Sequence, residues 1–214
     1  MFLCPTGESQ GHGKSWEIDI LKGFGISLEK QKKCKQSDIY DGLKEDSITN
    51  RNVSIKTTHN MSLDCSDIIR FLTKSKELDI IVIYYEQKMK KLKKAIKTYF
   101  INHDELIEKL KKDIKSIYKI EFEKWIKELE EFIKDVKSIP EGECSDNSYI
   151  GKKNKICKDI PYFNIAPKVD SKKQRRVQCS INLNKIIEDD EVTTKEYEGG
   201  VFRNIKYNKY MISE

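Results

Sequence analysis

The pattern of apolar and polar residues is most regular over residues 52–58. Val53 and Ile55 alternate there with Ser54 and Lys56. Because successive side chains of a strand point to opposite faces, this alternation predicts a strand with one apolar and one polar face.

Three further strands are predicted in the first half of the chain. Residues 37–41 form one strand, joined to residues 52–58 by a polar hairpin over 42–51. The continuous apolar run 78–85 predicts a strand buried on both faces. Residues 94–101 are rich in β-forming types and predict its hairpin partner, although the lysine-rich stretch leading into them would also suit a basic helix.

Helical spacing of apolar residues occurs in three regions. A helix is predicted over 15–25, ending at Gly25, and a short helix over 66–73, capped by Ser66. Two amphipathic helices follow within about 103–139. Their apolar positions are Leu106, Ile107, Leu110, Ile114 and Ile117, then Phe122, Trp125, Ile126, Leu129, Ile133 and Val136.

The last third of the chain predicts a loop and then more β structure. Residues 143–160 are polar and contain Gly151, so we expect a long loop. A β segment follows within about 161–183, and the periodicity is poor beyond Glu188. The polar face expected to be exposed in that segment consists of Arg176, Gln178, Ser180 and Asn182.

A chain of 214 residues suits one well-packed domain. The order of elements predicts an α/β fold with a mixed central sheet of five or six strands flanked by helices. Charged residues make up 36% of the chain, and the net charge is +6. This mild excess suits a protein that meets a polyanion along one face.

The segment Met1–Gly7 shows no signal-peptide pattern, and no run approaches 18 apolar residues. We therefore expect a cytoplasmic protein without a membrane span. Free thiols are expected, because no CxxC spacing occurs. The six cysteines are Cys4, Cys34, Cys65, Cys144, Cys157 and Cys179.

Asp41, Ser54 and Lys56 form the candidate chemical site. Ser54 and Lys56 share one face of their strand, and Asp41 ends the strand before it. If the two strands pair, an acid and a lysine converge at a sheet corner. Such a pair could bind a divalent metal and orient the water that hydrolyses a phosphodiester. The competing interpretations are a surface lysine and ordinary Asp-Gly turn chemistry.

These residues resemble the PD-(D/E)xK nuclease superfamily, which includes most type II restriction endonucleases. The family pattern is a helix with a Glu, a strand with an Asp, and a strand ending in (Asp/Glu)-x-Lys. The matching stretches are Gly13-Lys14-Ser15-Trp16-Glu17, Asp38-Ile39-Tyr40-Asp41-Gly42 and Val53-Ser54-Ile55-Lys56-Thr57-Thr58.

The resemblance implies Glu17 as the helix carboxylate, Asp41 as the metal-binding aspartate and Lys56 as the catalytic lysine. Asp38 and Asp46 are alternatives for the aspartate, and Glu17 also fits a first-turn acid favoured by the helix dipole. The chain departs from the pattern at Ser54, where the family has an acid. Some members draw that acid from the following helix, which would be Asp67 here, with Asp64 as second choice.

A basic run is the candidate DNA contact. Arg and Gln have bidentate geometry for base edges, and lysines suit phosphates. A solvated charge cluster that protects a sheet edge is the other interpretation. The proposed contacts are Lys172, Lys173, Gln174, Arg175, Arg176 and Gln178.

The resulting hypothesis is a Mg²⁺-dependent, sequence-specific endonuclease for double-stranded DNA. It would form a homodimer and have a partner methyltransferase encoded nearby. Residues 1–214 would be one nuclease domain: a catalytic half (about 11–101), a helical part (about 103–139) and a DNA-contacting β part (about 161–183). The alternatives are a noncatalytic nucleic-acid-binding module and an interaction protein with bridged cysteines.

Overall fold

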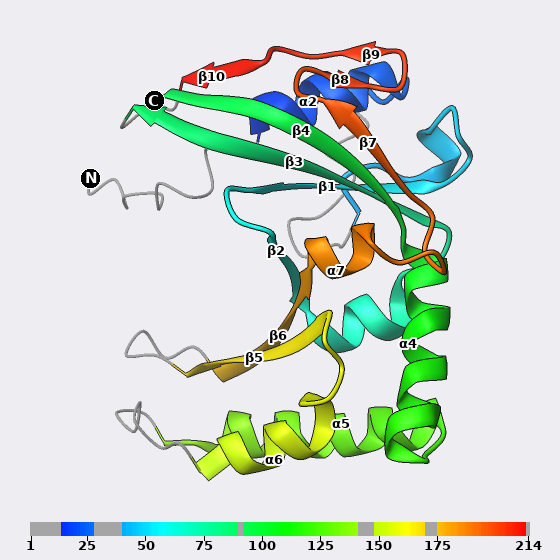
Figure 1. Ribbon diagram of the computed structural model, residues 1–214, viewed down its shortest axis with the longest axis vertical. Coiled ribbons are helices and arrows are strands. Elements are labelled where there is room, and N and C mark those ends of the chain that lie inside the picture. Colours follow the sequence, from blue (N-terminus) through cyan, green and yellow to red (C-terminus); the bar gives the residue numbers. More distant parts are fainter. Residues whose placement is uncertain (1–13, 28–39, 90–91, 141–147, 170–174, 213–214) are drawn as a thin grey trace. The chain divides into compact units, whose positions relative to one another are not determined.

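The chain forms two compact units made of interleaved segments (Figure 1). Unit 1 consists of Met1–Met61, Lys76–His103 and Thr193–Glu214, and unit 2 of Ser62–Ser75 and Asp104–Val192. The structure is a computed structural model, and the residues that it describes are 14–27, 40–89, 92–140, 148–169 and 175–212. The predicted division into catalytic, helical and DNA-contacting parts stays a prediction.

Unit 1 is built on a mixed five-stranded sheet. The strand order is β1-β3-β4-β10, with β7 also paired to β4; β1 and β3 are parallel, and the other pairs are antiparallel. A mixed central sheet with helices is therefore confirmed. The elements are α2 (Lys14–Gly23), a 3-10 turn (Lys44–Asp46), β1 (Asn52–Thr58), β3 (Leu78–Met89), β4 (Leu92–Asn102), β7 (Thr194–Glu198), β8 (Val201–Phe202), β9 (Ile205–Lys206) and β10 (Tyr210–Ile212).

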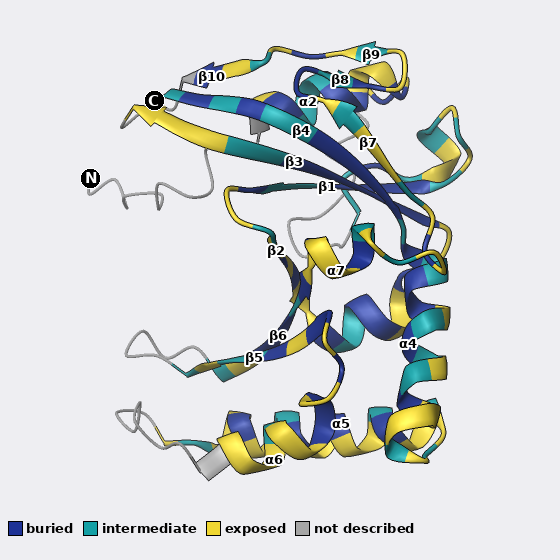
Figure 2. Cartoon of the chain, in the orientation of Figure 1, coloured by how far each residue is buried: buried dark blue, intermediate teal, exposed yellow. Residues whose placement is uncertain are grey.

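Helix α2 covers one face of this sheet. Val53 and Ile55 of β1 and Ile81 and Ile83 of β3 join the core on that face. The helix contributes Trp16, Ile20, Leu21 and Phe24. Strand alternation places Ser54 and Lys56 on the opposite face. Figure 2 shows that the last residues of β3 are exposed, in agreement with the burial of residues 86–89.

Gly199 packs against the backbone of β4, where the register shifts opposite Tyr84 and Tyr85. A Cβ added at Gly199 would lie 2.1 Å from the carbonyl oxygen of Ala95. Because a backbone atom would have to move, Gly199→Ala should lower the free energy of unfolding by about 1–3 kcal/mol. Urea denaturation measures this change.

The control is Gly151→Ala, which adds the same methyl group at an exposed position of helix α6, where nothing lies within 4 Å of the added carbon. This variant should be stabilised by about 0.5–1 kcal/mol, because glycine is unfavourable inside a helix. Equal effects at the two positions would contradict the packing described for Gly199.

Unit 2 combines helices with a three-stranded antiparallel sheet in the order β2-β6-β5. Trp125 of α5 donates from Nε1 to the Ile156 carbonyl of α6 (2.8 Å) and contacts the ring of Phe163. The elements are β2 (Ser62–Asp67), a π-helical turn (Arg70–Lys74), α4 (His103–Tyr118), α5 (Phe122–Ser138), α6 (Ser148–Cys157), β5 (Phe163–Val169), β6 (Arg175–Asn182) and α7 (Leu183–Ile187).

Three sequence predictions are wrong in this unit. Helix α6 lies inside the expected loop 143–160. Ser66 is not a helix cap: it has φ +65° in β2, and Asp67 accepts a hydrogen bond from the Arg70 amide instead (2.9 Å). Gln178, expected to be exposed, is 8% exposed in the middle strand of its sheet.

In unit 1, the poorly periodic tail forms strands β7 to β10, which the sequence pattern did not predict. They are two to five residues long, too short for a recognisable period.

Candidate functional site

The candidate site lies at the edge of the unit 1 sheet, where the chain before β1 turns back along it. Gly42 and Val53 form an antiparallel bridge, with Val53 N donating to Gly42 O (2.8 Å). The Asp41 amide donates to the Val53 carbonyl at 2.8 Å. The two arms of the expected hairpin therefore pair at Asp41–Gly42 and Val53, and this pairing brings Asp41 beside β1. The rest of the predicted strand 37–41, apart from Tyr40, lies outside the described residues.

The Asp41 carboxylate binds β1 at the edge of the described sheet. Its Oδ2 accepts a hydrogen bond from the Ile55 amide (2.6 Å) and a longer one from Ser54 Oγ (3.3 Å). An edge strand presents backbone amides without a neighbouring strand, and the carboxylate satisfies one of them. Ser54 is 1% exposed, so its hydroxyl serves this contact from a buried position.

Lys56 is half-buried and close enough to Asp41 for its charge to act on the carboxyl group. Burial raises the pKa of Asp41 above its ordinary value. The Lys56 charge and the hydrogen bonds from Ile55 and Ser54 lower that pKa in part. The site therefore joins a desolvated acid to a cation, a combination that recurs at functional sites.

The raised pKa predicts a pH-dependent cost of folding. Because the folded protein holds the Asp41 proton more tightly than the unfolded chain, this group stabilises the fold relatively less as pH rises from about 4 through its raised pKa. Asp41→Asn cannot titrate but keeps an oxygen for the Ile55 amide. The free energy of unfolding of the native protein should therefore fall relative to the variant over that range. Urea denaturation at several pH values measures this, and parallel curves would contradict it.

The other predicted metal ligands lie elsewhere. Glu17 is half-buried on α2 in unit 1. Asp67 belongs to unit 2, where its Oδ1 caps the helical turn, and Asp64 accepts from the Ser66 amide. Over the described ranges, no group of three or more His, Cys, Asp or Glu side chains is arranged to hold a metal ion.

The predicted DNA-contacting run is only partly described, since Lys172, Lys173 and Gln174 lie outside the described residues. The guanidinium of Arg175 donates to the Ile139 and Pro140 carbonyls at the end of α5 (2.9 and 2.7 Å), which is a structural role. Gln178 is buried, so its side chain is not presented to a base edge. Arg176 is exposed as expected.

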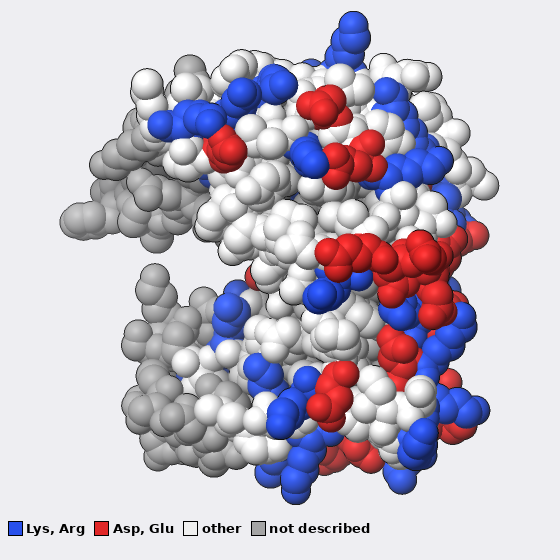
Figure 3. Space-filling view, in the orientation of Figure 1, with Lys and Arg blue, Asp and Glu red and all other residues white. Residues whose placement is uncertain are grey.

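Acidic side chains gather beside α4 on the face of unit 2 shown in Figure 3. There Lys109 lies 3.4 Å from Asp113 and 3.1 Å from Asp189, and Glu191 is also near (3.7 Å). This part of unit 2 is electrostatically unsuited to a phosphate backbone.

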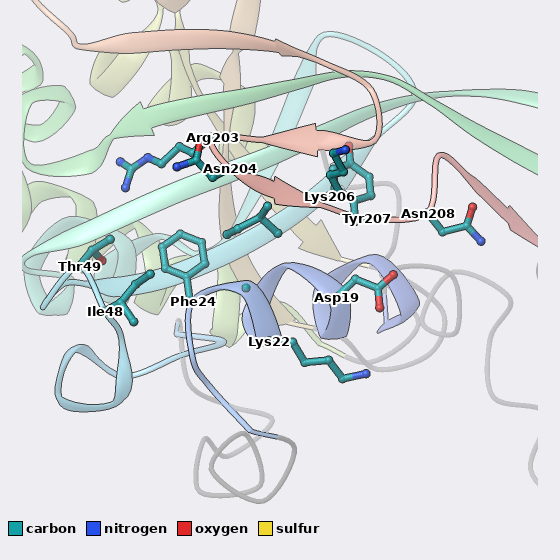
Figure 4. A pocket seen from close by; sticks show the side chains of 12 residues that line it. Asp19, Lys22, Phe24, Ile48, Thr49, Arg203, Asn204, Lys206, Tyr207 and Asn208 are labelled. Atoms are coloured by element: carbon teal, nitrogen blue, oxygen red, sulfur yellow. The ribbon is translucent and has the colours of Figure 1, made fainter.

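The sequence interpretation missed a cavity in unit 1, between α2 and the β8–β9 turn (Figure 4). Arg203 and Lys206 line it, but they lie in the tail, where no pattern pointed to a site. The sequence pattern there consists of two basic residues close to Asn204. Such a pair is common in proteins and does not by itself indicate a binding site.

Comparison of the chain with protein-family models, with curated proteins and with solved structures finds no match.

Among the helices described, none has the length and apolar character required to cross a membrane. Cys65, Cys157 and Cys179 are buried and free, while the other three cysteines lie outside the described residues.

Proposed function

We propose that the chain is a Mg²⁺-dependent endonuclease that hydrolyses phosphodiester bonds of double-stranded DNA, with a restriction-endonuclease-like core in unit 1. The observation that carries the proposal is the convergence of Asp41 and Lys56 at the edge of β1, where Ser54 donates a hydrogen bond to the carboxylate. These two residues are not fully exposed, and they interact electrostatically. An acid and a lysine in this relation fit the resemblance to PD-(D/E)xK nucleases.

Lys56 would act on the scissile phosphate and its attacking water. An ammonium group is a donor only, so it can hold a water or phosphate oxygen in place and stabilise the negative charge that develops on phosphorus. Water adds to phosphorus as the bond to the leaving oxygen breaks, and that oxygen takes up a proton. The half-buried position of Lys56 strengthens its electrostatic effect relative to a fully solvated lysine.

Asp41 is the residue best suited to hold the metal ion. Its Oδ1 makes no hydrogen bond within the part of the chain that is described, whereas Oδ2 binds Ile55 and Ser54. Mg²⁺ commonly takes one or two protein carboxylates and completes its shell with water and phosphate oxygens. Because Glu17 lies on α2, which covers the other face of the sheet, the remaining ligands would be water and phosphate oxygens. When bound, the ion would neutralise phosphate charge and lower the pKa of its water.

Incubation of the protein with plasmid DNA tests the proposal. With Mg²⁺ we expect discrete fragments on a gel, and with EDTA in place of Mg²⁺ we expect intact plasmid. The fragment pattern also reports sequence specificity. Intact plasmid over a range of Mg²⁺, Mn²⁺ and salt concentrations would overturn the endonuclease function.

The contacts of Asp41 are also compatible with a second candidate, a noncatalytic nucleic-acid-binding module. In that case the carboxylate serves only to satisfy the Ile55 amide and to hold the hairpin against β1. DNA binding that weakens steeply with salt, without cleavage under any metal condition, would support this module over the nuclease.

A restriction enzyme that cuts both strands of a symmetric site needs two active sites related by a two-fold axis. The proposed function therefore includes a homodimer and a methyltransferase encoded nearby. Light scattering after gel filtration measures the mass of the assembly, and we expect twice the 25.1 kDa of the chain.

A further inference from the structure

The cavity of unit 1 has an apolar floor and an open mouth. It measures about 690 Å³, and α2 and the β8–β9 turn form its walls (Figure 4). Ile205 supplies apolar surface inside it, Phe24 lies beneath with only 1% of its surface exposed, and Ile48 also lines the cavity. Ile48 is 75% exposed, so its apolar surface is open to a ligand.

Positive side chains line this cavity in excess. Lys22, Arg203 and Lys206 contribute to its lining, against the single acid Asp19. None of these three cations forms an ion pair with a carboxylate that the structure describes, although other lysines of unit 1 do, such as Lys97 with Glu196. Cations without an acidic partner in the described part of the chain, beside apolar surface, suit an anion that also carries an apolar ring.

Arg203 is held in place before any ligand arrives. It occupies the two-residue turn between β8 and β9 with φ +52°, a conformation that favours glycine or asparagine. Its guanidinium lies 5.2 Å from the ring centre of Phe100 and 5.3 Å from that of Phe202. A long side chain kept in a costly backbone conformation, with its charged group stacked on two rings, indicates a role for that group.

We propose that this cavity binds a nucleotide, either free or as one unit of a DNA strand. The base would lie on the apolar floor, Arg203 would bind the phosphate, and Lys206, which Figure 4 shows on the other side of the cavity, would add positive charge. Asn204 and Asn208, which also line the cavity, carry the amide groups that hydrogen-bond base edges. The site shares no lining residue with Asp41, Ser54 and Lys56, so this proposal does not rest on the endonuclease function.

Isothermal titration calorimetry tests the site in the full chain carrying Lys56→Ala, with EDTA present so that no DNA is cut. The probes are deoxyadenosine monophosphate, inorganic phosphate and a short single-stranded oligonucleotide. We expect binding of the nucleotide, the oligonucleotide or both, and weaker binding of phosphate. The tighter of the two nucleotide-containing probes identifies the source, a free nucleotide or a DNA strand.

Two variants connect binding to the cavity. Arg203→Gly removes the guanidinium and suits the left-handed turn, so the fold should be retained while binding weakens roughly tenfold or more. Lys206→Gln should also weaken binding. Lys76→Gln removes an exposed charge from unit 1 outside the cavity and should bind as the parent does.

Three results would overturn the proposal. One is the absence of binding for every probe. Another is equal binding by the Arg203→Gly and Lys76→Gln proteins, with thermal unfolding confirming that both are folded. The third is phosphate bound as tightly as the nucleotide, since the apolar floor would then contribute nothing. None of these results depends on whether the native protein cleaves DNA.

Discussion

Lys56→Ala should abolish detectable plasmid cleavage while leaving the fold intact. The side chain is half-buried on the polar face of β1 and interacts electrostatically with Asp41, so its removal takes away the only cation described beside that carboxylate. Loss of one group that stabilises developing charge lowers rates by about 100- to 1,000-fold. The measurement is the rate of plasmid linearisation with Mg²⁺.

The matched control is Lys76→Ala, which removes an exposed lysine from the same unit. Its cleavage rate should equal that of the native protein. Thermal unfolding followed by circular dichroism establishes that both variants are folded. A Lys56→Ala protein that cleaves at the native rate would remove Lys56 from the mechanism and, with it, the basis of the endonuclease proposal.

Trp16→Ala should cause the largest loss of stability among single changes in unit 1. Trp16 is fully buried, packs 5.9 Å from the ring of Tyr85, and donates from Nε1 to the Asn208 carbonyl at 2.7 Å. The bond joins α2 to the C-terminal segment, 192 residues away in sequence. Removing a buried aromatic side chain of this size lowers the free energy of unfolding by about 3–5 kcal/mol.

Trp16→Phe separates packing from hydrogen bonding, because it keeps a buried ring and loses only the Nε1 donor and part of the indole. The free energy of unfolding of Trp16→Phe should fall by only about 1–2 kcal/mol. Urea denaturation followed by far-ultraviolet circular dichroism measures both, since tryptophan fluorescence would change with the substitution itself. A loss below about 1 kcal/mol for Trp16→Ala would contradict the packing of α2 on the sheet.

Local periodicity predicted the elements that bury one face along their whole length. Strand β1 has the predicted bounds, and α5 buries Trp125, Leu129 and Val136 as its apolar spacing indicated, together with Phe132, which the predicted stripe did not include. In α6, by contrast, the residues described as buried are Ile156 and Cys157 at its end. Two adjacent buried positions among residues 150–157, where burial is described, do not make a helical stripe, so the sequence pattern favoured a loop.

Polar residues were harder to place than apolar ones. Gln178 alternates with apolar neighbours and was expected to be exposed, but β6 is the middle strand of its sheet, and the residue is buried there. The register shifts between β2 and β6 at this point, and Ser66 has a left-handed backbone conformation there. Asp67, and not Ser66, accepts the hydrogen bond from the Arg70 amide at the start of the helical turn. Both outcomes depend on which strands pair, and single-strand alternation contains no information about pairing.

The sequence alone determined that Ser54 and Lys56 share the polar face of β1 and that Asp41 precedes them at a turn, because a strand period of two residues and an Asp-Gly turn are local properties. Only the tertiary structure decided that the Asp41 carboxylate binds the Ile55 amide, that Asp67 belongs to a different unit, and that Arg203 and Lys206 meet α2 around a cavity. These outcomes depend on contacts between residues distant in sequence. Such contacts form because buried backbone groups require hydrogen-bond partners and apolar surfaces are removed from water. The partners can come from any part of the chain, so a local sequence pattern does not identify them.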